Sequence, residues 1–126
     1  MTEATPEVVD EAQLQFCLTG DREVDADLMR MALSLCDESL TLMAQAIDAG
    51  DDAAWTKAAH RSRGSCGMMG FNRIAALLHE AEYGTNLTPE TKRRMLPALR
   101  AALAELGQRL EAMGYDVSST NETPNA

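Results

Sequence analysis

The stretch DDAAWTKAAHRSRGSCGMMG, residues 51–70, determines the fold. Its core-type side chains recur at alternating intervals of four and three residues, at Trp55, Ala59, Ser62, Cys66 and Met69. This spacing is typical of a helix that packs one face against nearly antiparallel neighbours. Asp51 or Asp52 should cap the helix at its start, and Gly70 should end it. The stretch therefore predicts one helix of a bundle, running to about Met69.

The length of the chain fits one domain, and its composition indicates helices. The chain has 126 residues and a mass of 13.7 kDa, enough for a single core. Alanine, leucine and methionine contribute 20, 15 and 8 residues, against only 4 valines and 2 isoleucines. Unbranched side chains lose little freedom in a helix, whereas branched ones favour strands. The predicted fold class is therefore all-α.

Charge and hydropathy exclude several classes of protein. The net charge of −9 argues against a nucleic-acid-binding surface. No stretch approaches the roughly 18 apolar residues of a membrane span, and the first residues do not resemble a signal peptide. Three cysteines in apolar surroundings predict reduced core thiols, not disulfides or a zinc site. We expect a cytoplasmic protein with no metal site and no membrane contact.

The remaining pattern, read outward from residues 51–70, predicts four further helices. Caps, glycines and prolines place them at about 6–17, 25–50, 71–83 and 88–114, the first starting at Thr5-Pro6-Glu7. Pro97 should kink the last helix or split off its first turn. The predicted architecture is an antiparallel four-helix bundle with an extra short N-terminal helix, over residues 1–114. Residues 115–126 have nothing to bury and are expected to form a disordered tail.

One of the two histidines lies on the wrong face of its helix for a core residue. At about 100° per residue, His60 falls about 140° from Trp55, and Gly64 and Gly67 lie near 180° and 120°. Each glycine inside a helix costs about 0.5–1 kcal/mol relative to alanine. Two glycines, which have no side chain, beside an exposed imidazole predict that a large group must come close to it.

A local excess of positive charge surrounds His60. Residues 1–60 carry thirteen acids and three bases, yet no acid occurs between Asp52 and Glu80. The bases in that interval are Lys57, Arg61, Arg63 and Arg73. A basic island on an acidic protein fits an anion or an acidic partner. An imidazole is partly neutral at cell pH, so its free ring nitrogen can act as a nucleophile.

Residues 60–70, HRSRGSCGMMG, resemble the signature of histidine-containing phosphotransfer (HPt) domains. That signature joins a histidine to a basic residue three positions on and to glycines four and ten positions on. Ile74, Leu78 and Glu82 resemble its continuation, and the similarity extends over residues 21–113. Two positions depart from it. Ser62 stands where an apolar residue is usual, which should loosen the packing behind the histidine. Arg63 stands where a lysine is usual; it keeps the positive charge, but its donors are planar and fork-like.

The resemblance implies a four-helix bundle that relays phosphoryl groups. His60 would accept a phosphoryl group on Nε2 from a receiver aspartate of a hybrid histidine kinase and pass it to a response regulator. Arg63 would stabilise the phosphohistidine. The residues implied in partner access and docking are Lys57, Arg61, Gly64, Gly67 and Met68, with Arg73 as a further steering charge. The chain would be a phosphocarrier without a cofactor of its own, and the receiver would hold the Mg²⁺.

Other functions stay open at this stage. An HPt-like module that is never phosphorylated could bind and inhibit a receiver or kinase, an alternative that Ser62 leaves open. An enzyme is disfavoured, because no acid follows His60 directly or lies on its face within a turn. His79 is interpreted as a structural or surface residue, and residues 92–94 as a solvated helix start. We expect a monomer, because a dimer interface would cover the basic face.

Overall fold

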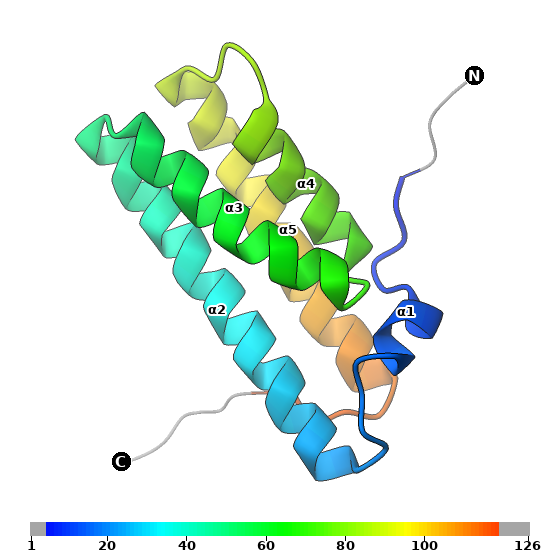
Figure 1. Ribbon diagram of the computed structural model, residues 1–126. Coiled ribbons are helices and arrows are strands. Elements are labelled where there is room, and N and C mark those ends of the chain that lie inside the picture. The colour runs from blue at the N-terminus through cyan, green and yellow to red at the C-terminus, as the bar shows by residue number, and fades with distance from the viewer. Residues whose placement is uncertain (1–4, 119–126) are drawn as a thin grey trace, which may run out of the picture.

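The computed structural model describes residues 5–118, and the regular structure within them is helical. The elements are α1 (Glu11–Gln15), α2 (Arg22–Ala49), α3 (Asp52–Met68), α4 (Asn72–Tyr83) and α5 (Pro89–Ala112). Figure 1 shows α2 to α5 side by side as a bundle, with successive helices running in opposite directions and α1 near one end. The all-α prediction is confirmed. Over the described residues, no helix combines the length and the apolar character that a membrane crossing requires.

Side-chain caps explain where three of the four long helices begin. Asp51 accepts a hydrogen bond from the Ala54 amide, and Thr88 accepts one from the Thr91 amide. Helix α2 begins at Arg22, earlier than the predicted start at about residue 25, because Asp21 caps it. Asp25 is buried and accepts hydrogen bonds from the preceding loop. The bond from the Thr19 amide is the main reason why the pKa of Asp25 is lowered, although burial opposes it.

The N-terminal helix is much shorter than the predicted 6–17. Helix α1 begins only at Glu11, after the cap residue Asp10. Two contacts hold the segment before it against the bundle: the Asp10 amide donates to the Gly70 carbonyl at 2.8 Å, and Arg73 Nε donates to the Pro6 carbonyl at 3.0 Å. These tertiary hydrogen bonds override the local start signal at Thr5-Pro6-Glu7.

The C-terminal part differs in part from the expectation. Helix α5 is continuous over Pro89–Ala112, so Pro97 does not split off its first turn; Pro97 is exposed, so water can satisfy the carbonyl that its ring leaves unpaired. The predicted absence of buried residues after position 114 fails for Tyr115 and Val117, which are both in the core. The guanidinium of Arg22 lies over the Tyr115 ring, 4.4 Å from its centre. Residues 119–126, the rest of the expected tail, lie outside the described residues.

Helix α3 buries one complete face. All five residues of its predicted apolar seam are buried, and Trp55 is 1% exposed. The Trp55 indole Nε1–H donates to the carbonyl of Ala81 in α4 at 2.7 Å, which satisfies a buried polar group. Lys92 of α5 is buried as well; its Nζ lies 2.5 Å from Asp52 Oδ1 and 5.3 Å from the centre of the Trp55 ring. The start of α3 is therefore tied to both α4 and α5.

Sulfur and hydroxyl groups pair between α2 and α3. Cys36 and Cys66 are buried and Cys17 is half-buried, all three as free thiols. A hydrogen bond to Cys66 and burial together raise the pKa of the Cys36 thiol. One turn away, the Ser62 hydroxyl donates to Ser39 Oγ at 2.6 Å, and both serines are buried. Ser62 was expected to loosen the packing, but its hydroxyl has a partner on the facing helix.

The serine pair predicts a coupled effect on stability. Ser39→Ala or Ser62→Ala alone should lower the free energy of unfolding by about 1–3 kcal/mol, because each leaves one buried hydroxyl unpaired. The double variant should lose less than the sum of the two. Urea unfolding of the four proteins measures this coupling, with Ser65→Ala, at an exposed position of α3, as the control. Additive losses would mean that the two hydroxyls do not depend on each other.

Candidate functional site

His60 lies on the exposed face of α3, opposite the buried seam. Its side chain is 62% exposed. Gly64 and Gly67 lie beside it on the same face, and a Cβ atom placed on either glycine would meet no atom within 4 Å. The backbone of α3 is therefore open next to the imidazole. A side chain at either position would therefore meet open space, so close helix packing does not require these glycines.

A carboxylate from α4 joins His60 to Arg63. Glu82 Oε2 lies 2.5 Å from His60 Nδ1, and Glu82 Oε1 accepts a hydrogen bond from Arg63 Nε, also at 2.5 Å. The Glu82 side chain is only 6% exposed. Burial disfavours its charged form, but the hydrogen bonds from Arg63 and His60 outweigh burial and lower the pKa of Glu82. Glu82 is therefore an ionised carboxylate at neutral pH.

The ionised carboxylate determines which nitrogen of His60 carries the proton. A carboxylate can only accept a hydrogen bond, so His60 Nδ1 must donate to it. In the neutral ring the other nitrogen, Nε2, then keeps its lone pair. Arg63 Nη2 lies 3.4 Å from Nδ1, but a guanidinium only donates, so this contact brings a positive charge close without competing for the proton. The imidazole is thus set up as a nucleophile at Nε2.

Arg63 is the cation of the site that contacts both Glu82 and His60. Its side chain is 28% exposed, and the hydrogen bond to Glu82 is the main cause that raises its pKa. With Nε engaged by Glu82, Nη2 of the guanidinium lies 3.4 Å from His60 Nδ1. Arg63 therefore places a positive charge beside the imidazole, on the side of Nδ1.

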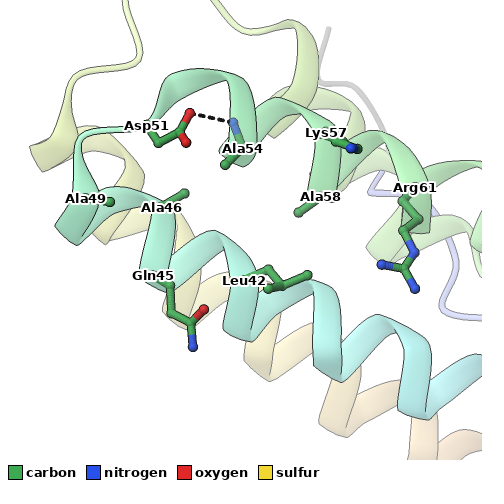
Figure 2. A pocket seen from close by; sticks show the side chains of 9 residues that line it. All are labelled: Leu42, Gln45, Ala46, Ala49, Asp51, Ala54, Lys57, Ala58 and Arg61. Atoms are coloured by element: carbon green, nitrogen blue, oxygen red, sulfur yellow. Dashed lines mark hydrogen bonds between the residues drawn. The ribbon is translucent and has the colours of Figure 1, made fainter.

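Lys57 and Arg61 lie along a groove between α3 and α2. The groove has a volume of about 380 Å³, and Figure 2 shows these two cations on its α3 side, with Leu42 on the α2 side. Lys57 is exposed, and Arg61 Nη2 lies 3.5 Å from Glu38 Oε1. Arg61, which lines the groove, follows His60 directly on α3. Small side chains of both helices form most of the remaining wall: Ala46, Ala49, Ala54 and Ala58.

The other residues singled out in the sequence lie in different surroundings. Met68 is 66% exposed at the end of α3. Arg73 is not brought together with His60; its Nη1 lies 2.7 Å from Glu105 Oε1 of α5. His79 is exposed on α4, where its ring packs against Tyr83. Within residues 5–118, no three histidine, cysteine or acidic side chains gather in a way that could hold a metal ion.

Glu82 is the site residue whose role sequence reasoning missed. The expectation that no acid lies near His60 considered only α3, whereas the acid comes from α4, 22 positions along the chain. A signal was present. Leu78 and Ala81 belong to the apolar face of α4, so Glu82 follows at the edge of that face, where an acidic side chain can reach a neighbouring helix.

A comparison with known families identifies this arrangement. The family model of the Hpt domain matches residues 27–114, well over half of the chain. The chain belongs to the Hpt domain family. The match covers nearly all of α2 and the whole of α3 to α5, and leaves α1 outside. Membership of this family supports a phosphotransfer module of two-component signalling; Hpt domains are phosphocarriers and interact with receiver domains. Comparisons with curated proteins and with solved structures gave no match.

The buried carboxylate of Glu82 predicts a stability that is sensitive to acid. The pKa of Glu82 is lowered in the folded protein, so its contribution is complete above the ordinary glutamate pKa of about 4.3 and is lost as the pH falls through the lowered value. Glu82→Gln should lower the free energy of unfolding at pH 7 and weaken its dependence on pH below about 4.3. Urea unfolding from pH 7 to pH 3 measures both effects.

Glu80→Gln, at an exposed position of the same helix, is the matched control and should retain the acid sensitivity of the natural chain. If both variants kept the same pH dependence as the natural chain, the stabilising role of the Glu82 carboxylate would be disproved.

Proposed function

We propose that His60 is the phosphoacceptor of this Hpt domain. In this proposal it receives a phosphoryl group from the receiver aspartate of a hybrid histidine kinase and passes it to the receiver of a response regulator. The observation that carries the proposal is the 2.5 Å contact between His60 Nδ1 and the ionised Glu82, which leaves Nε2 with its lone pair on a largely exposed ring.

The transfer needs no proton to enter or leave the ring. The Nε2 lone pair attacks the phosphorus atom of the acyl phosphate, the bond from phosphorus to the aspartyl oxygen breaks, and its electron pair leaves with the carboxylate. Nδ1 keeps its proton throughout, and the positive charge that develops on the imidazole faces Glu82. Transfer to the next receiver follows the same path in reverse. Positioning and charge neutralisation are the main demands of phosphoryl transfer, and both are met by these groups.

Within this chain, Arg63 supplies the positive charge that offsets the negative charge of the phosphoryl group. Its Nη2 atom is already 3.4 Å from the ring, and its Nε is engaged by Glu82. A phosphoryl group on Nε2 carries negative charge on three oxygens, for which a guanidinium offers directional donors. Arg63 therefore favours the phosphorylated form of His60.

The docking surface surrounds His60 on α3. Gly64 and Gly67 let a receiver approach the backbone, Met68 adds an apolar contact, and Lys57 and Arg61 attract the acidic pocket of the receiver. In this proposal the receiver brings the Mg²⁺ and the chain binds no cofactor. We further propose a cytoplasmic monomer that does not bind nucleic acid, a view supported by its free thiols and its net charge of −9.

The phosphoacceptor assignment predicts a site-specific label. A panel of phosphorylated receivers should transfer phosphate to the natural chain in an acid-labile, alkali-stable form, and His60→Gln should abolish the label. His79→Gln, the same change at the other histidine, is the matched control and should keep it. A label that survives His60→Gln would disprove the assignment. Binding of a receiver with no phosphate on any protein would instead favour the inhibitory module.

The open backbone predicts opposite effects on stability and transfer. Because no atom lies within 4 Å of a Cβ at Gly64, Gly64→Ala should raise the free energy of unfolding by about 0.5–1 kcal/mol. It should also slow phosphotransfer, and Gly64→Gln should slow it further, because both fill the space that the receiver needs. Stopped-flow or quench-flow transfer rates, with urea unfolding, measure the two effects.

Gly107→Ala in α5 is the matched control, since Gly107 has equally open surroundings away from His60. It should stabilise the fold without changing the rate. Unchanged transfer in Gly64→Gln would contradict close approach of the receiver at this position.

A further inference from the structure

Tyr83 is an aromatic residue at the site, and it takes no part in the proposed phosphoryl transfer. It is the last residue of α4, directly after Glu82, and it is 56% exposed. Its ring lies against Arg63, with the guanidinium carbon 5.4 Å from the ring centre. This distance is within the range of a cation–π contact. Arg63 is thus contacted by two consecutive residues of α4.

The two contacts act on different parts of the guanidinium. Glu82 binds Nε within the plane of the group, at 2.5 Å. A single hydrogen bond leaves the terminal nitrogens free to swing about it. Tyr83 lies on the guanidinium and limits that movement, so the end of Arg63 is kept beside His60, where Nη2 is 3.4 Å from Nδ1.

The Tyr83 ring is itself held in place. The His79 ring packs against it, one turn earlier on α4, with ring centres 4.8 Å apart. Helix α4 ends directly after Tyr83, where the Gly84 amide donates to the Glu80 carbonyl at 2.8 Å. A Cβ on Gly84 would lie 2.6 Å from that carbonyl oxygen, so the chain can leave the helix this way only with a glycine. Tyr83 therefore has a defined position although it is largely exposed.

We propose that Tyr83 is a positioning residue that holds the Arg63 guanidinium beside His60 for the phosphorylated state. The inference rests on the proposed function. It depends on arginine, because a planar guanidinium can pack on an aromatic ring while donating in its own plane, whereas a lysine ammonium has no such plane. Arg63 stands where a lysine is usual in the HPt signature, and Tyr83 supplies the surface that this replacement can use.

The test is a double-mutant cycle on the phosphotransfer equilibrium. Each variant is brought to equilibrium with the same phosphorylated receiver, and the ratio of phospho-His60 to phosphorylated receiver is measured. Tyr83→Leu should lower the ratio about two- to fivefold, the effect expected of an exposed cation–π contact. Tyr83→Phe keeps a ring and should restore most of the ratio. In Arg63→Gln protein, which has no cation, Tyr83→Leu should have no further effect.

A second measurement does not require phosphorylation. The Nε–H resonance of Arg63 in the NMR spectrum should be shifted by the nearby ring, and this shift should be lost in Tyr83→Leu but retained in Tyr83→Phe. An unchanged resonance, or an equal loss of phosphotransfer with and without Arg63, would overturn the role of Tyr83. If the natural chain accepts no phosphate from any receiver, the proposed function fails, while the resonance still decides whether Tyr83 positions Arg63.

Discussion

One carboxylate, that of Glu82, connects the groups on which the site depends. It accepts from His60 through one oxygen and from Arg63 through the other, so a single buried charge orients both the imidazole and the nearest cation. Without these two partners, burying the charged carboxylate would lower the stability of the fold. Together the partners keep Glu82 ionised. The site also requires α3 and α4 to be in register, because His60 and Arg63 come from one helix and Glu82 from the other.

The register of α3 is maintained on its opposite face. Trp55 donates to the Ala81 carbonyl, one residue before Glu82, so this buried hydrogen bond and the ion-pair cluster share the same turn of α4. Because this face is fully buried, the other face of α3 does not need side chains that contribute to stability. It can carry Gly64 and Gly67 beside His60 at a cost that the core tolerates. The buried face of α3 thus sets its register with α4, and the exposed face carries the imidazole and the open backbone beside it.

Periodicity predicted the part of this arrangement that lies within one helix. The buried face of α3 and the outward position of His60 follow from 3.6 residues per turn, which requires no knowledge of neighbours. Contacts between distant segments have no such local signal. The hydrogen bond from Asp10 to Gly70 shortens α1, and the packing of Tyr115 against Arg22 brings residues beyond α5 into the core. The role of Glu82 belongs to the same class, because it depends on how α4 packs beside α3.

The two departures from the HPt signature also depend on neighbouring helices. Ser62 places a hydroxyl in the core, where it would be destabilising alone, and Ser39 of α2 accepts its hydrogen bond. Arg63 brings a longer and more directional cation than lysine, and Tyr83 of α4 lies against it. In both cases the unusual residue is on α3 and the residue that accommodates it is on a helix packed against α3. A substitution near His60 therefore has to be judged together with its contacts across the bundle.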